Sequence, residues 1–215
     1  MGACCSCWFG EDGENGSGGE SGKETEMANR ASAAASTEAG RSLAISRAMT
    51  APTIEVENGN CVSGYGLALV NVVLEQDAGY WEVHIEIPEG SGAAYEVMFG
   101  VATKKDRKFY NALQEQEEVS PASNGTDLMR PIPISNGDVV GVAMQQSDLP
   151  MVQFLLNGEP LHSLSVNRFR GNVYPSLYLP ENEGLTAKLK FAESDFQQLS
   201  PHARFGPIIV ARGLL

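Results

Sequence analysis

The chain has 215 residues and a formal net charge of −12, from 15 Lys and Arg against 27 Asp and Glu. A field of this sign repels phosphate backbones, so nucleic acid is not expected as a partner. The sequence has no run of about eighteen apolar residues and no apolar signal-peptide core near its N-terminus. We therefore expect neither a membrane-spanning helix nor secretion.

The first nine residues are predicted to carry lipid. Gly2 followed by Ser6 fits the acceptor pattern for N-myristoylation. A lone myristoyl chain binds membranes only marginally, with a partition constant of roughly 10⁴ M⁻¹. Acidic residues follow, so a polybasic patch cannot strengthen the anchor, and palmitoylation of Cys4, Cys5 or Cys7 is the expected second signal. This places the protein at the cytoplasmic face of a membrane, alongside a soluble cytoplasmic pool.

Cysteine spacing supports a reducing compartment. Three of the four cysteines lie within four positions, and only Cys61 stands elsewhere, whereas a disulfide framework needs cysteines spread through the fold. Three clustered thiols without a nearby histidine also make a poor tetrahedral zinc site. We expect no metal and no cofactor. The alternative to lipidation is that the N-terminus is a disordered tail in which the cysteines have no role.

Aromatic residues mark where the folded part begins. Between Phe9 and Tyr65 the chain has none, and aromatic side chains carry much of the area that a core buries. We therefore divide the chain into a lipidation segment, a disordered linker that is first acidic and then alanine-rich, a folded domain, and an apolar tail. Their boundaries are 1–9, 10–51, 52–205 and 206–215. The tail is expected to pack back onto the domain as an extra strand or cover.

Segment 80–87 alternates apolar and polar residues, as a half-buried strand does. Its apolar face is Trp81, Val83, Ile85 and Ile87, and its polar face, expected to meet solvent, is Glu82, His84 and Glu86. Other strand-like runs are 67–74, 96–103, 139–145, 152–156, 173–179 and 185–191. Asn157-Gly158 between two strands is a tight-hairpin signal. Many short strands with turn signals predict an all-β, antiparallel two-sheet sandwich.

Five blocks, in order, resemble SPRY domains. They are Gly79-Tyr80-Trp81-Glu82-Val83, Phe99-Gly100-Val101-Ala102, Gly137-Asp138-Val139-Val140-Gly141-Val142-Ala143, Phe154-Leu155-Leu156-Asn157-Gly158-Glu159-Pro160-Leu161 and Val173-Tyr174-Pro175-Ser176-Leu177. Leu189-Lys190-Phe191 resembles the closing strand. The resemblance spans residues 53–205 and implies a SPRY/B30.2-like sandwich of the concanavalin-like jelly-roll type. It also implies a non-catalytic domain that recognises peptides or proteins.

The chain is similar, more narrowly, to small SPRY-only proteins of the SPRY domain-containing protein 7 type. Those proteins also join a cysteine-rich N-terminus to this domain. The shared features are the lead-in 56–59, the segment 170–175 and a Pro/Phe-containing tail that ends in apolar residues. Segment 104–130 departs from that pattern, so no loop-borne specificity is carried over there.

Aromatic residues in these blocks are expected to build the core rather than a ligand site. They are Trp81, Phe99, Phe154, Tyr174 and Phe191. Gly100 and Gly141, within strands, indicate a bulge or a close approach of the backbone to a neighbour.

No catalytic centre is predicted. His84, His162 and His202 stand far apart, without thiol or acidic neighbours at ligand spacing. A glycoside hydrolase needs two carboxylates about 5–5.5 Å or about 6.5–9.5 Å apart, whereas Glu82 and Glu86 on one strand would be roughly 13 Å apart. We therefore expect a binding protein and no enzyme. A glycan- or small-molecule-binding lectin-like module is the alternative to protein recognition.

Two basic clusters are candidates for a partner site, because SPRY domains recognise peptides through loops at one end of the sandwich. The candidate residues are Lys104, Lys105, Arg107, Lys108, Tyr110, Arg168 and Arg170. Cations beside aromatic residues suit an acidic or aromatic-bearing peptide. The alternative is a solvated loop whose charge is neutralised by the acidic run that contains Glu115, Glu117 and Glu118.

Overall fold

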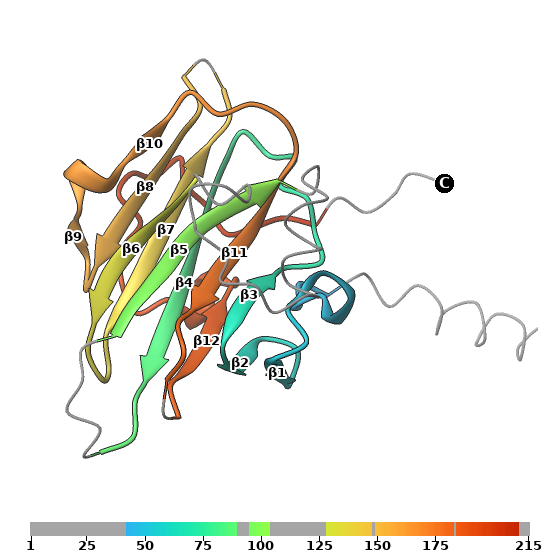
Figure 1. The fold of residues 1–215 in the computed structure, drawn as a ribbon. Coiled ribbons are helices and arrows are strands. Elements are labelled where there is room, and N and C mark those ends of the chain that lie inside the picture. Colours follow the sequence, from blue (N-terminus) through green and yellow to red (C-terminus); the bar gives the residue numbers. More distant parts are fainter. Residues whose placement is uncertain (1–41, 90–94, 104–127, 148, 183, 211–215) are drawn as a thin grey trace, which may run out of the picture. The chain divides into compact units, whose positions relative to one another are not determined.

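The computed structural model of the chain describes residues 42–89, 95–103, 128–147, 149–182 and 184–210. In these residues the chain forms twelve strands, arranged in two sheets in which every strand pair is antiparallel (Figure 1). The prediction of an all-β, two-sheet antiparallel sandwich is therefore confirmed.

The larger sheet has the order β1-β2-β12-β4-β7-β8-β10, and β9 pairs with β8 at its side. Its strands are β1 (Ile54–Glu57), β2 (Cys61–Gly64), β4 (Ala78–Glu86), β7 (Val139–Gln145), β8 (Met151–Leu156), β9 (Glu159–Pro160), β10 (Val166–Asn167) and β12 (Thr186–Lys190). Asn157 and Gly158, with φ angles of 52° and 86°, form the turn between β8 and β9. Left-handed backbone at both positions fits the twist of a two-residue hairpin, as predicted.

The smaller sheet has the order β3-β11-β5-β6. Its strands are β3 (Gly66–Leu69), β5 (Tyr95–Thr103), β6 (Met129–Ile134) and β11 (Val173–Leu179). The sequence did not predict β6, because Pro131 and Pro133 lack the N–H groups that a strand uses for pairing. They are tolerated because β6 lies at the edge of the sheet and pairs only with β5.

One apolar core fills the space between the sheets. Trp81, Val83 and Ile85 on β4 belong to it, as the alternating pattern predicted. The five aromatic residues expected in the core, Trp81, Phe99, Phe154, Tyr174 and Phe191, are all buried. Their side chains therefore stabilise the fold and are not displayed to a ligand.

Residues 42–51, assigned above to the linker, pack against the sandwich. Ile45 is buried and forms a bridge with Val70, and its N–H donates to the carbonyl of Gly59 at 2.6 Å. Ala51 is also buried and donates its N–H to the carbonyl of Leu67. A short 3-10 helix, η1 (Arg47–Met49), lies between them. The folded part thus begins about ten residues earlier than aromatic content indicates, because small aliphatic side chains make this contact.

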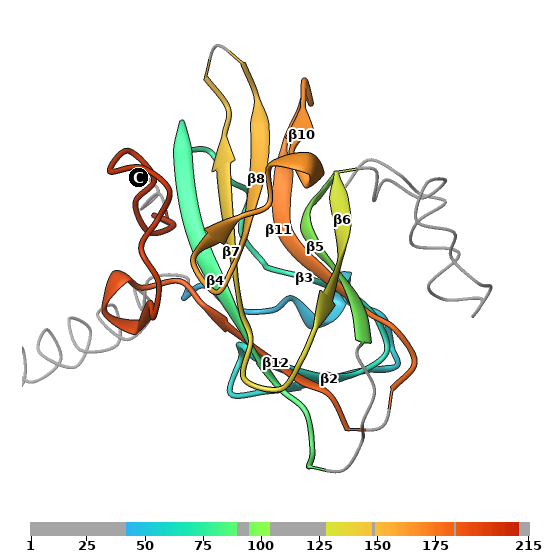
Figure 2. The ribbon, with the colours of Figure 1, turned by 90° about the vertical axis from the view of Figure 1, so that its left-hand side faces the viewer.

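The segment from η4 (Glu193–Asp195) to Val210 covers the outer face of the larger sheet. Figure 2 shows it in red, running beside β4 on the side away from the smaller sheet. Phe205 packs with Tyr80, Ala143 and Leu155 in a second, smaller apolar cluster. We call residues 192–210 the C-terminal cover.

The end of the cover is tied to the start of β4. The N–H of Tyr80 donates to the carbonyl of Gly206 at 2.8 Å, and Tyr80 forms a parallel bridge with Pro207. The N–H of Ile209 donates to the side chain of Gln76. The prediction that the tail packs back is confirmed for residues 206–210, while 211–215 lie outside the described residues.

The helical elements of the described residues are three-residue 3-10 turns. None of them is long or apolar enough to cross a membrane.

Candidate functional site

Three connections meet at one end of the sandwich, which we call the loop end: β3–β4 (residues 70–77), β7–β8 (146–150) and β10–β11 (168–172). Main-chain hydrogen bonds join them. The N–H of Gln146 donates to Asp77, that of Leu74 to Val173, and that of Arg168 to Pro150, each at 2.8–2.9 Å. The connections are therefore held as one unit, and the side chains that they carry keep fixed relative positions.

Arg168 has a left-handed backbone, with φ 65°. In the described residues the other non-glycine positions of this kind are Asn58 and Asn157, both in turns. Asn tolerates this conformation because its short side chain can hydrogen-bond to the nearby backbone. The arginine side chain cannot do this, so the left-handed backbone at Arg168 costs of order 1 kcal/mol of stability. Local strain of this kind is often found where a side chain must point in a particular direction.

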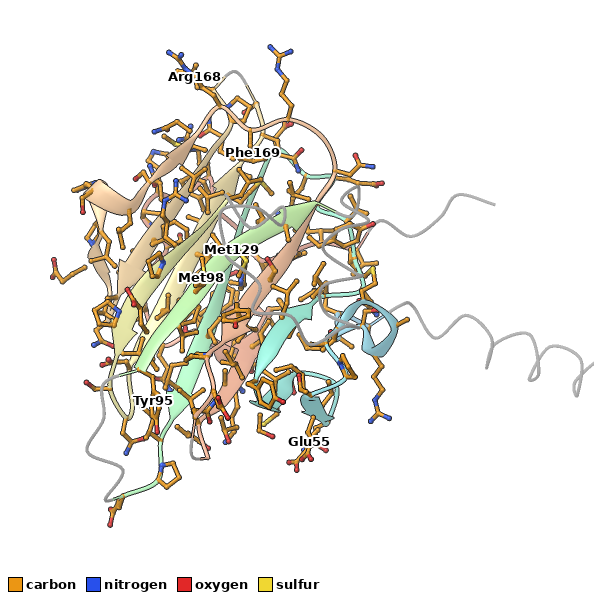
Figure 3. All side chains as sticks on the ribbon, viewed as in Figure 1. Glu55, Tyr95, Met98, Met129, Arg168 and Phe169 are labelled. Atoms are coloured by element: carbon orange, nitrogen blue, oxygen red, sulfur yellow. The ribbon has the colours of Figure 1, made fainter. Side chains whose placement is uncertain are left out.

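The loop end displays two cations around a buried anchor. Arg168 and Arg170 are exposed, and Phe169 between them is only 5 % exposed and belongs to the core. Figure 3 labels Arg168 at the tip and Phe169 further in. The ring of Phe169 therefore belongs to the core and is not displayed to a partner beside these cations. The exposed apolar side chain at this end is Leu149, which is 68 % exposed.

Lys104, Lys105, Arg107, Lys108 and Tyr110 lie outside the described residues, and the first basic cluster remains a prediction. The chain leaves β5 at Thr103, which pairs with Val173, three positions after Arg170. It re-enters the sheet at Met129, which pairs with Gly100. The described residues on either side of this gap therefore belong to the neighbouring strands β5 and β6.

Glu82 and Glu86, expected to share a solvent face, have different surroundings. Glu86 is exposed and pairs with Lys188 across β4 and β12. Glu82 is 0 % exposed, so the expectation that it meets solvent is wrong. The physical reason is the C-terminal cover, which lies over this part of β4.

The buried carboxylate of Glu82 accepts four hydrogen bonds. Its Oε1 accepts from the hydroxyl of Tyr80 at 3.1 Å and from the N–H of Gln198 at 2.8 Å. Its Oε2 accepts from Nε2 of His84 and from the N–H of Gln197, both at 2.8 Å. A buried charge is tolerated when its lone pairs are used in this way. Glu82 therefore clamps the main chain of the cover to the sheet and has no face open to a substrate.

Tyr80 completes this arrangement. Burial first, and then the charge and the hydrogen bond of Glu82, raise the pKa of its hydroxyl well above the ordinary value, so it stays a donor. Its ring meets Phe196 of the cover edge-on, with centroids 5.0 Å apart. Gly141 on β7 makes room for it, since a Cβ there would lie 2.5 Å from the Tyr80 hydroxyl oxygen. The close approach predicted for Gly141 is confirmed.

Sequence reasoning missed the role of Glu82 because alternation alone assigns every second residue of β4 to solvent. The apolar tail was the only sequence feature that pointed to burial of a polar strand face. It predicted a cover on the domain, but it did not indicate which strand lies beneath that cover.

The remaining candidate groups give no centre for chemistry within the described residues. No group of three His, Cys, Asp or Glu side chains there could hold a metal ion. Cys61 on β2 is a free thiol, and burial, its largest influence, raises its pKa. A raised pKa lowers the thiolate fraction, which is the reactive form. The lipidation residues Gly2, Cys4, Cys5 and Cys7 lie outside the described residues.

No family model matches the sequence, and no curated protein matches it. Solved structures that are similar to it include the following three. The SPRY domain of human HERC1 is 15 % identical over 68 % of this chain and 96 % of that chain, with a TM-score of 0.47. The PSpry domain of TRIM65 is 15 % identical over 69 % and 90 %, with a TM-score of 0.46. The NHR1 domain of Drosophila melanogaster neuralized is 10 % identical over 68 % and 96 %, with a TM-score of 0.47.

Proposed function

We propose that this chain is a membrane-tethered protein-interaction adaptor. Its sandwich binds a protein or peptide partner at the loop end, and acyl chains on Gly2 and on Cys4, Cys5 or Cys7 hold it at the cytoplasmic face of a membrane. The residue blocks that resemble SPRY domains support a recognition role. The narrower likeness to SPRY-only proteins of the SPRY domain-containing protein 7 type stays a prediction.

One observation carries the recognition half of this proposal. Arg168 and Arg170 are exposed on connections that hydrogen bonds hold together, and Arg168 keeps a left-handed backbone there. Neither guanidinium has a hydrogen-bond acceptor among the described residues. In a chain of net charge −12, two such cations next to exposed Leu149 suit a partner that offers carboxylates and an apolar side chain.

Site-specific crosslinking tests the recognition half. A photoreactive amino acid replaces Leu149 in the full-length protein in cells, with and without Arg168→Glu and Arg170→Glu. We expect a crosslinked partner that the double variant loses, since two reversed charges repel an acidic segment. Arg204→Glu reverses one charge on the C-terminal cover, outside the loop end, and should leave the crosslink unchanged. A crosslink that survives the double variant, or none at all, would contradict the loop end as the binding site.

Membrane fractionation tests the anchoring half. We expect Gly2→Ala, and separately a Cys4/Cys5/Cys7 triple Ser variant, to move the protein to the soluble fraction, because one acyl chain alone binds only marginally. High salt should not release the wild type, since the anchor does not depend on charge. If both variants remain on membranes as the wild type does, the chain is not held by these lipids.

A further inference from the structure

A pocket of about 290 Å³ lies where the C-terminal cover meets the β8–β9 hairpin and the 3-10 helix η3 (His162–Leu164). One wall comes from residues 153–155, 160–162 and 165, and the other from Pro201, His202, Arg204 and Phe205. The two walls are nearly forty residues apart in the sequence. The pocket therefore exists only while the cover is docked on the sheet.

The cover wall is held in place from within. Glu82 binds the main-chain N–H groups of Gln197 and Gln198, and Phe205 is buried beside Tyr80 and Leu155. These contacts lie directly before and within the stretch that forms the wall. The wall is thus pre-organised, and a ligand would not have to order it on binding.

Every charged or titratable side chain that lines the pocket is basic: His162, His202 and Arg204. No carboxylate lines it. In a chain of net charge −12, a concave site with this composition favours anions over cations. The loop end, by contrast, carries its cations on a protruding tip, so the two sites are distinct.

The donors of the pocket are free to meet an oxyanion. The guanidinium of Arg204 lies over the ring of Phe205, with Cζ 4.9 Å from the ring centroid, and no described residue accepts a hydrogen bond from it. Nδ1 of His202 accepts the N–H of Arg204 at 3.1 Å, so in the neutral ring Nε2 carries the hydrogen and is a donor. A planar guanidinium with free N–H groups is well suited to a carboxylate or a phosphate.

Apolar surface completes the lining, through Pro160, Leu161 and Pro201. The volume lies near the lower end of the range for small-molecule sites, about 300–1,000 Å³, and so admits one ring or a short chain with its charged group. We propose that this pocket binds a small organic anion, a carboxylate or phosphate carried on an apolar group.

Amide NMR on the full-length ¹⁵N-labelled protein tests this site with benzoate and phenyl phosphate as probes, and with benzyl alcohol as the uncharged counterpart. We expect saturable shifts in residues 161–165 and 202–205 with at least one anion, and none with benzyl alcohol. Saturation by only one anion assigns the ligand class as carboxylate or phosphate. If neither anion saturates, or if benzyl alcohol binds equally well, the proposal is wrong.

Charge-matched variants locate the binding. Arg204→Gln should lower the affinity for whichever anion binds more tightly by roughly tenfold, because a charged hydrogen-bond partner is lost. Arg170→Gln removes the same charge at the loop end and should leave the affinity unchanged. Both residues are exposed, so neither variant should impair folding. Equal affinity in Arg204→Gln and wild type would overturn the assignment, whatever the result of crosslinking at Leu149.

Discussion

The loop end and the C-terminal cover use charged groups in opposite ways. At the loop end, Arg168 and Arg170 are exposed, and no described residue accepts a hydrogen bond from their guanidinium groups, although the backbone at Arg168 is strained. Beneath the cover, Glu82 has no exposure and accepts four hydrogen bonds. A charge whose hydrogen bonds are all used within the chain holds the fold together. A charge whose donors are free is available to a partner.

Removing the clamp should have the largest effect. Glu82→Ala leaves the main-chain N–H groups of Gln197 and Gln198, the buried Tyr80 hydroxyl and His84 without their acceptor, and we expect it to lower the free energy of unfolding by about 3–5 kcal/mol. Urea denaturation measures this. Glu86→Ala on the same strand removes an exposed ion pair that solvent screens, and should cost much less than Glu82→Ala. Equal losses in the two variants would show that burial of Glu82 does not matter.

The space beside Tyr80 offers a second way to disturb the cover. Gly141→Ala places a methyl group against the Tyr80 hydroxyl, and we expect a loss of about 1–3 kcal/mol from overpacking. Tyr80→Phe removes the nearest clashing atom and leaves the ring carbons Cε2 and Cζ at 2.9 and 3.1 Å from the added methyl group, so the double variant should keep part of the strain but lose less than the sum of the single variants. Additive losses in this double-mutant cycle would mean that Gly141 matters for another reason.

Alkaline pH should weaken the cover through Tyr80. The folded state holds the phenolic proton more tightly than the unfolded chain does, so this stabilisation is complete below about pH 10 and is lost as the pH rises above it. The slope is at most about 1.4 kcal/mol per pH unit for one proton. Tyr80→Phe should have a flatter stability curve above pH 10 than the wild type. Tyr65→Phe, at an exposed site, should match the wild type.

The smallest effect is expected at the loop end and should have the opposite sign. Arg168→Asn suits the left-handed backbone, so we expect the free energy of unfolding to rise by about 0.5 kcal/mol while crosslinking at Leu149 falls. Arg170→Asn should give no such rise, because its φ is not positive. Lower stability in Arg168→Asn would argue that the arginine side chain itself supports the fold.

Much of the sandwich could be predicted because its signals are local. Alternation in β4 placed Trp81, Val83 and Ile85 in the core, and Asn157-Gly158 marked its hairpin. The sequence did not reveal β6, because Pro131 and Pro133 oppose strand formation except at an edge. It also did not reveal the packing of Ile45 on Val70, because the partner is distant along the chain. For the loop end, the arginines were predicted and the burial of Phe169 between them was not.

By itself, the sequence determined the all-β class, most strands, the inward face of β4 and the docking of the tail, since period and turn chemistry are properties of neighbouring residues. Only the tertiary structure decided that Glu82 is buried while Glu86 is not, and that His162, His202 and Arg204 line one pocket. The physical reason is that both outcomes depend on where the C-terminal cover crosses the sheet. That position is set by contacts between residues more than one hundred positions apart, such as Glu82 with Gln197 and Gln198.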